Sequence, residues 1–202
     1  MKVFFSPFSP FVRKVLVSAA ELGLDIEKLD CAAHPVARDK NIIESNPLGQ
    51  VPTLFTDDGA ELYDSRVICE YLDALAGGNK LIPASGEARW QRLMEQSLAD
   101  GLLNAALLMR YEQVIRPDGL RFEPWQRGQH EKVVDVLDRL EAWSPSFGDR
   151  VDIGTISIAC ALGYLDLRFP EEPWRSRPGL AAFYERFSER DSMVRTEHPV
   201  TA

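Results

Sequence analysis

The chain has 202 residues, of which 45% are hydrophobic and 27% are charged. This balance is typical of folded globular proteins and excludes a disordered, collagen-like or coiled-coil chain, and the length suits one large domain or two small ones. The formal net charge of −8 makes phosphate backbones and anionic lipids unfavourable partners, so we expect neither nucleic acid nor a membrane to be bound.

The cysteines and the start of the chain indicate the compartment. The 3 cysteines lie far apart and form no Cys-x-x-Cys pair, which is typical of a reducing compartment rather than of a disulfide framework. The first residues lack the apolar stretch of a signal peptide, and no apolar stretch is long enough to span a membrane. We therefore expect a cytoplasmic protein.

The first third of the chain alternates strand and helix patterns. Ser9 and Pro10 are typical of an N-cap followed by proline at the first helical position, and Gly23 is a typical stop. In chain order, the patterns predict strand 2–5, helix 10–22, strand 24–29, helix 37–45, strands 51–55 and 60–63, and a helix over 65–75. This β-α-β-α-β-β-α order predicts a mixed sheet with helices on its faces.

The rest of the chain carries helical patterns and no strand pattern. Apolar residues at helical spacing predict four helices, over 87–112, 125–143, 152–167 and 178–188. The third is apolar almost all round, which indicates a central, buried helix. We therefore predict an α/β domain over residues 1–76, a linker over 77–85 and an all-helical domain over 86–202.

Three short segments combine residue types that can carry chemistry. Ser9 places a hydroxyl beside the unpaired N–H groups and the positive end of a helix, an arrangement that stabilises an anion. Pro52 begins a strand, and a cis bond before it would expose the N–H and C=O of Val51 to an extended ligand. Taken alone, Ser9 is more simply explained as a plain cap and Pro52 as an ordinary edge-strand proline.

The third segment is Asp64-Ser65, at another helix start. Ser65 offers a hydroxyl and a backbone N–H to a carboxylate, and Asp64 offers an acceptor to an ammonium group. Together they suit the end group of an α-amino acid, although a plain N-cap explains the same two residues.

In combination, the segments resemble the soluble glutathione transferases, and the resemblance covers essentially the whole chain. The stretch Asn46–Leu54 matches the segment that contains the family's cis-proline, so we expect a cis Val51–Pro52 bond. The stretch Asp152–Ala159 looks like the start of the family's buried helix, with Asp152 as the cap and Thr155 three residues later, the reverse of the usual order. Asp caps well, so we expect this helix to form.

The resemblance implies a thioredoxin-like N-terminal domain, an all-α C-terminal domain, a homodimer, and glutathione as the co-substrate with no metal. It implies an enzyme that transfers the glutathione sulfur to a hydrophobic electrophile or reduces a peroxide. The residues that it assigns to glutathione binding are Phe11, Gln50, Val51, Pro52, Asp64 and Ser65. The pocket for the electrophile would be lined by apolar residues of the helical domain such as Leu107, Met109 and Tyr111, although the same apolar stripe is expected of any core helix.

The segment after the first strand indicates how the sulfur would be activated. Family members that use tyrosine carry it here, where this chain has Phe4, Phe5 and Phe8. The segment Ser9–Arg13 matches a Cys-Pro-Phe-x-x-Arg pattern with serine in the cysteine place, which looks like the bacterial serine type. Ser9 is therefore the predicted catalytic residue, and Ser6 is a rival hydroxyl.

Two other functions compete with this interpretation. Some relatives keep the fold as non-catalytic protein-interaction modules, but the presence of Ser9, Asp64 and Ser65 favours the enzyme. A thiol–disulfide reductase would need cysteine at the first helix start.

The remaining candidate residues have simpler explanations. Cys31 and His34 lack further ligands at zinc spacing, and His130 and His198 are isolated. Cys69 and Cys160 are predicted to be small core residues and Arg13 a structural ion-pair partner.

Overall fold

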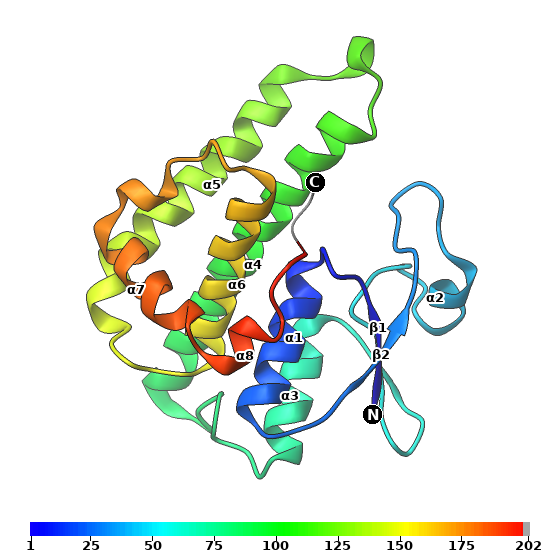
Figure 1. The fold of residues 1–202 in the computed structure, drawn as a ribbon, viewed down its shortest axis with the longest axis vertical. Helices are drawn as coiled ribbons and strands as arrows, with labels where there is room; N and C mark the ends of the chain where they lie inside the picture. Colours follow the sequence, from blue (N-terminus) through cyan, green and yellow to red (C-terminus); the bar gives the residue numbers. More distant parts are fainter. Residues whose placement is uncertain (200–202) are drawn as a thin grey trace. The chain divides into compact units, whose positions relative to one another are not determined.

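The protein is described by a computed structural model that covers residues 1–199, and the chain forms two units (Figure 1). One unit comprises residues 1–89 together with 190–199, and the other comprises residues 90–189. The predicted division into 1–76, 77–85 and 86–202 differs in that the C-terminal segment packs with the first unit, while residues 200–202 lie outside the described part.

The first unit contains a four-stranded sheet in the order β2-β1-β3-β4. Strand β1 is parallel to β2 and antiparallel to β3, and β3 is antiparallel to β4. The strands are β1 (Lys2–Phe5), β2 (Glu27–Asp30), β3 (Leu54–Phe55) and β4 (Glu61–Leu62). The mixed sheet and the element order confirm the predicted thioredoxin-like architecture.

Helices cover both faces of this sheet. Figure 1 shows α1 and α3 side by side on one face and α2 beyond the other face. The helices of this unit are α1 (Pro10–Glu21), α2 (Lys40–Ser45), α3 (Ser65–Leu75) and α8 (Asp191–Val194). The core between the sheet and α1 and α3 is fully buried, and it includes Val3, Val15, Leu54, Ile68 and Leu72.

Several predicted elements are shorter in the structure, for reasons that lie in the turns. Helix α2 begins at Lys40 rather than at residue 37, because the Asp39 side chain accepts the Asn41 N–H at 2.9 Å and so caps the helix there. The backbone N–H groups of Val36 and Ala37 instead donate to the His34 ring. Strand β3 begins only at Leu54, because the cis Val51–Pro52 bond and the side-chain hydrogen bonds to the Gln50 carbonyl hold the preceding residues in a turn.

The C-terminal segment contains α8, which the sequence patterns miss. Arg190 donates two hydrogen bonds of 2.8 Å to the Glu21 carboxylate at the end of α1, and the Ser192 hydroxyl donates a third to the same group. Hydrogen bonds from Arg190 and Ser192, together with the positive charge of Arg190, hold the pKa of Glu21 below its usual value, although burial opposes this shift. These bonds fasten the segment to α1, beside which α8 lies in Figure 1.

The second unit contains helices and no strand among its described residues. The four predicted helices are present, with ends within two residues of the prediction at most positions. The helices of this part of the chain are α4 (Gly86–Val114), α5 (Glu123–Trp143), α6 (Ile153–Arg168) and α7 (Pro178–Ser188), with short 3-10 turns at Asp118–Leu120, Ser144–Ser146 and Trp174–Ser176. Helix α6 is buried over nearly its whole length, as its apolar sequence predicts. Across residues 1–199, no helix combines the length and apolarity that crossing a bilayer requires.

The N-terminus of α6 carries a capping box of the reversed order that the sequence predicts. The Asp152 carboxylate accepts the Thr155 N–H at 3.1 Å, and the Thr155 hydroxyl accepts the Asp152 N–H at the same distance. Two of the helix's unpaired N–H groups are thereby satisfied.

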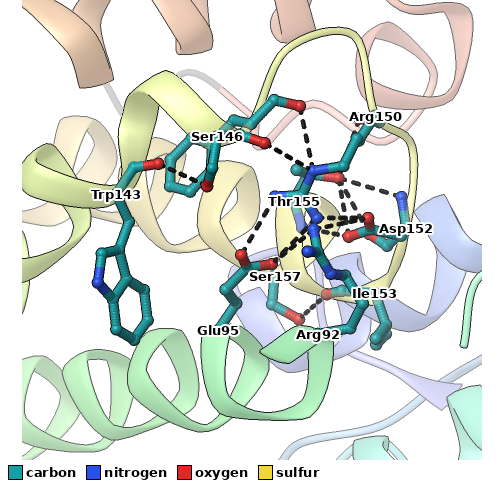
Figure 2. A network of polar contacts seen from close by, with 10 residues as sticks. Arg92, Glu95, Trp143, Ser146, Arg150, Asp152, Ile153, Thr155 and Ser157 are labelled. Atoms are coloured by element: carbon teal, nitrogen blue, oxygen red, sulfur yellow. Dashed lines mark hydrogen bonds and ion pairs between the residues drawn. The ribbon is translucent and has the colours of Figure 1, made fainter. Parts of the chain in front are cut away.

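A buried ionic network surrounds this cap (Figure 2). Arg150 donates to both carboxylate oxygens of Glu95, at 3.1 and 3.3 Å, and to Asp152 at 2.7 Å. Arg92 lies 3.5 Å from Glu95 and 3.4 Å from Asp152. A Cβ atom at position 154 would lie 2.1 Å from a Glu95 oxygen, so only glycine fits there. The network therefore joins α4 to the start of α6.

Burial dominates the electrostatics of the network. The Glu95 side chain is fully buried. Burial raises the pKa of Glu95 to about 7, with Arg92 opposing the rise and Asp152 adding to it. Burial likewise raises the pKa of Asp152. In both carboxylates the positive charge of Arg92 opposes the effect of burial on the pKa.

Candidate functional site

The sheet topology brings the three candidate segments to one edge. Strand β1 ends at Phe5 and leads directly to Ser9, while β3 runs the other way, so the residues before β3 lie beside the end of β1. The Phe4 N–H donates to the Thr53 carbonyl at 3.0 Å, which fixes this neighbourhood. Leu54 pairs with Leu62, so β4 also ends at this edge and continues into α3.

Ser9 is the N-cap of α1. Its backbone is extended, with φ −85° and ψ 118°, and its hydroxyl oxygen accepts the Val12 N–H at 3.3 Å. The hydroxyl uses only an acceptor site in this bond, so its own proton remains for donation to a further group. Ser9 is half-buried, so its side chain is accessible enough to contact a ligand.

Ser6, the rival hydroxyl, lies in the turn that leads to Ser9. Its carbonyl accepts the Ser9 N–H at 3.1 Å, and both serines line a small cavity of about 40 Å³ together with Arg13. Ser6 caps no helix, so the unpaired N–H groups of α1 favour Ser9 as the anion-stabilising hydroxyl.

The segment before β3 is held by buried side chains. The Val51–Pro52 bond is cis, which confirms the sequence prediction. The Asn46 amide donates to the Gln50 carbonyl at 3.2 Å and to the Thr53 hydroxyl at 3.0 Å, and that hydroxyl donates to the same carbonyl. Within residues 1–199 the Val51 N–H and C=O make no hydrogen bond, so both can pair with a ligand.

Asp64 and Ser65 form the start of α3. One carboxylate oxygen of Asp64 accepts the Arg66 N–H at 2.9 Å, which caps the helix, and the side chain is exposed, so the other oxygen remains for a cation. Ser65 is 2% exposed and lies at the first helical position, where a backbone N–H has no partner within the helix. The Tyr63–Asp64 bond is also cis.

For the other predicted site residues, the structure shows their position and exposure but no contact that assigns them a role. Gln50 is exposed at the same edge, and Phe11 is half-buried with its ring 5.7 Å from Lys14 Nζ. Leu107, Met109 and Tyr111 lie on α4, where Met109 is buried and lines a cavity of the second unit. Their role toward an electrophile therefore stays a prediction.

The role predicted for Arg13 needs a correction. Arg13 is buried, as a structural residue should be, but no carboxylate pairs with it within the described chain. Its guanidinium donates instead to the Met193 carbonyl at 3.1 Å. The last carbonyls of a helix lack partners, so the end of α8 supplies the acceptor that an acidic residue was expected to supply.

The remaining candidates have structural roles. Cys69 and Cys160 are fully buried, as predicted for core residues. The Cys31 thiol donates to the Phe5 carbonyl at 3.3 Å, and burial raises the pKa of this thiol. His34 accepts two N–H groups of its own turn. No group of three or more potential metal ligands occurs in the part of the chain that the structure describes.

One supporting residue of the site was missed by sequence reasoning. Asn46 is 1% exposed and orders the turn that presents Val51, although in the sequence it reads only as turn chemistry. The signal that could have found it is the spacing Asn-x₆-Thr, because the side chains of Asn46 and Thr53 hydrogen-bond to each other and to the Gln50 backbone carbonyl.

Comparison with known proteins identifies the relatives of this arrangement. Residues 3–80 match the family model of the glutathione S-transferase N-terminal domain, and residues 123–186 match that of the C-terminal domain. The uncharacterized GST-like protein YibF of Escherichia coli (strain K12) is 34% identical over 98% of this chain and 99% of its own.

Solved structures give the same result. A glutathione transferase family member from Pseudomonas fluorescens Pf-5, crystallised with bound glutathione, is 45% identical with a TM-score of 0.96, over 98% of this chain and 99% of its own. A glutathione S-transferase from Methylobacillus flagellatus KT with bound glutathione is 33% identical with a TM-score of 0.90, over 98% and 99% of the two chains. The matches in both units, over nearly the full length, show that this chain belongs to the glutathione S-transferase family.

Proposed function

We propose that the protein is a glutathione transferase that binds glutathione at the sheet edge formed by Ser9, Val51 and the start of α3. It holds the glutathione sulfur as a thiolate and transfers it to a hydrophobic electrophile or reduces a peroxide. One observation supports the proposal: three features lie at the same edge of the sheet. They are the capping hydroxyl of Ser9, the backbone N–H and C=O of Val51 that make no hydrogen bond within the described chain, and the N-terminus of α3.

Each part of glutathione has a chemically matched partner at this edge. The γ-glutamyl carboxylate suits the Ser65 hydroxyl and N–H at the positive end of α3, and the γ-glutamyl ammonium suits Asp64. The extended backbone of the tripeptide pairs with the N–H and C=O of Val51, next to Pro52. Phe11 and Gln50 complete the predicted contacts. The glutathione-bound relatives support this choice of ligand.

Activation of the sulfur follows from the same geometry. A free thiol has a pKa of ~8.5, so only a small share is thiolate at neutral pH. The Ser9 hydroxyl donates a hydrogen bond to the sulfur, and the N-terminus of α1 favours its negative charge. Ser9 is not the nucleophile, because the thiolate itself forms the new carbon–sulfur bond. The thiol proton passes to solvent, and the electrophile loses its leaving group or, if unsaturated, takes up a proton. With a peroxide, the thiolate attacks one oxygen and breaks the O–O bond, which gives an alcohol and a glutathione sulfenic acid; a second glutathione then converts the sulfenic acid to glutathione disulfide and water.

Calorimetric titration with glutathione tests the proposal. The parent protein is expected to bind glutathione, and Ser65→Ala is expected to weaken binding by about 1.5–3 kcal/mol, or roughly 10- to 150-fold, because a charge-assisted hydrogen bond is lost. Asp64→Asn is expected to weaken binding similarly while it keeps the helix cap, because the amide oxygen still accepts the Arg66 N–H but carries no charge.

Two outcomes would contradict this placement. A parent protein that fails to bind glutathione would favour the non-catalytic interaction module. Unchanged affinity in both variants would move the γ-glutamyl end elsewhere. Asp58→Asn, at an exposed carboxylate in the β3–β4 turn, serves as the matched control and should leave affinity unchanged.

We further propose that the protein is a homodimer. Helix α4 exposes large apolar side chains one turn apart, with Trp90 67% and Met94 54% exposed, and a surface of this kind favours association. Sedimentation at micromolar concentration is expected to show twice the 22.7 kDa of one chain, and Trp90→Glu is expected to shift it to the mass of one. Leu120→Glu, at an equally exposed apolar residue outside α4, should leave the dimer intact. A single-chain mass for the parent would contradict the proposal.

A further inference from the structure

The second unit contains a cavity that the glutathione site does not use. Its volume is about 430 Å³, within the range of small-molecule pockets, and it lies among α4, α5, the end of α6 and the segment that follows. Its wall is apolar where Met109, Val133, Leu165 and Phe169 line it. None of the residues assigned to glutathione lies in this unit.

The rim of the cavity carries an excess of negative charge. Glu171 and Glu172 both line it, and the Glu172 side chain is only 8% exposed. His130 Nε2 lies 2.7 Å from Glu172 and donates to one of its oxygens. The Arg177 guanidinium also lines the cavity but is engaged by Asp138 at 2.6 Å, so its charge is already balanced. A ligand at this rim therefore meets carboxylate acceptors.

The wall and rim together define what fits. Water inside an apolar wall forms few hydrogen bonds, so an apolar ring or chain gains by replacing it. An ammonium group gains by reaching a carboxylate that is mostly withdrawn from solvent, because the attraction is screened less there than at an exposed site. An anion would face two carboxylates and no unpaired cation of the rim.

We propose that this cavity binds a small amphipathic amine, with its apolar body against Met109 and Phe169 and its ammonium group at Glu172. The site shares no residue with the proposed glutathione site, because every residue of the cavity belongs to the helical unit. Glutathione and the amine therefore contact different residues, whereas Met109 is also one of the residues predicted to line the electrophile pocket.

The first test compares two ligands that share one ring and differ in charge. Tryptamine and indole-3-propionate are titrated into the full-length protein and followed by ligand-observed NMR and calorimetry. Tryptamine is expected to bind about tenfold or more tightly than indole-3-propionate, because only its charge suits the rim. Absence of tryptamine binding, or equal binding of the two ligands, would overturn the proposal.

The second test places the binding in the cavity. Val134→Trp fills the cavity and is expected to weaken tryptamine binding by about tenfold or more, since the ring then competes for the same volume. Val136→Trp is the matched control, because Val136 is also half-buried on α5 but does not line the cavity. Equal loss in both variants would place the ligand elsewhere.

A third variant keeps the volume and removes only the charge. Glu172→Gln retains an oxygen that accepts the His130 N–H, so the fold should be preserved. The preference for tryptamine over indole-3-propionate is expected to disappear in this variant. A preference that survives unchanged would show that Glu172 does not hold the ammonium group, and would refute the assigned site.

Discussion

Replacing Ser9 by alanine is expected to slow glutathione conjugation at neutral pH by about 3- to 25-fold. If the site lowers the thiol pKa by about two units from ~8.5, the thiolate share at pH 7 rises from about 3% to about three-quarters, which sets the upper figure. A more stabilised thiolate is also a weaker nucleophile, which offsets part of the gain and sets the lower figure. The defect is expected to shrink as the pH approaches 9, where the thiol ionises without help.

Ultraviolet absorbance of bound thiolate measures the same effect directly. The absorbance of the glutathione complex is titrated against pH, and the midpoint is expected to move upward in Ser9→Ala. Glutathione affinity should change little, because Val51, Asp64 and Ser65 are untouched. Stability should fall by only about 0.5–2 kcal/mol, since the substitution removes one helix cap.

Ser6→Ala is the matched control. Ser6 lines the same small cavity but caps no helix, so its replacement should leave the thiol titration where the parent has it. If Ser9→Ala conjugates as fast as the parent between about pH 6 and 8, another group holds the sulfur, and a slow Ser6→Ala would identify it.

Ser9→Cys makes a complementary test of the helix dipole. The new thiol lies at the N-terminus of α1, where its pKa should fall. Its thiolate is then expected to attack oxidised glutathione, forming a mixed disulfide at position 9 and releasing one glutathione thiolate. Mass spectrometry detects the adduct. An unmodified protein under these conditions would argue against thiolate stabilisation at this position.

Local sequence signals were sufficient to predict where several of the helices begin. Ser9, Asp64 and Asp152 are each predicted and observed as N-caps, because a capping side chain acts on N–H groups two or three residues away. The start of α7 at Pro178 is equally local. Such signals need no knowledge of the tertiary fold.

Contacts between distant residues were not predictable in the same way. Glu21 is separated from Arg190 and Ser192 by about 170 residues in the sequence. The sequence around α8 therefore contains no local pattern that predicts its contact with α1. Arg13 failed as an ion-pair prediction for the same reason, because its acceptor is the backbone of Met193. Sequence patterns also fail to predict that α4 buries Glu95 and exposes Trp90. The spacing of apolar residues along this helix predicts the opposite, with Trp90 buried and Glu95 exposed.

The burial of Glu95 leads to the second large effect, which is expected on replacing Arg150 by methionine. The substitution leaves the buried Glu95 and the half-buried Asp152 without one of the two guanidinium groups that bridge them, so that only Arg92 remains (Figure 2). Removing one partner of a buried ion pair costs about 3–5 kcal/mol, which corresponds to a fall in melting temperature of about 6–20 °C for a chain of this size. Denaturant unfolding measures the loss.

The loss should depend on pH with a definite sign. Burial raises the pKa of Glu95 from 4.5 to about 7 in the parent, so the folded state holds a proton there that the unfolded state has released, and this contribution to stability is lost as the pH rises through 7. Without Arg150, ionisation of Glu95 and Asp152 becomes less favourable still. The destabilisation of Arg150→Met is therefore expected to be larger at about pH 8 than at about pH 5, where protonation removes the repulsion.

An exposed arginine provides the comparison that isolates burial. Arg195 pairs with Asp191 at the surface, where both side chains are more than 70% exposed, so Arg195→Met is expected to cost about 0–1 kcal/mol at either pH. If Arg150→Met proved no more destabilising than this control, or equally destabilising at both pH values, the network of Figure 2 would not be what fastens α4 to the start of α6. A loss confined to the higher pH would identify as its cause the negative charge of the carboxylates that Arg150 no longer neutralises.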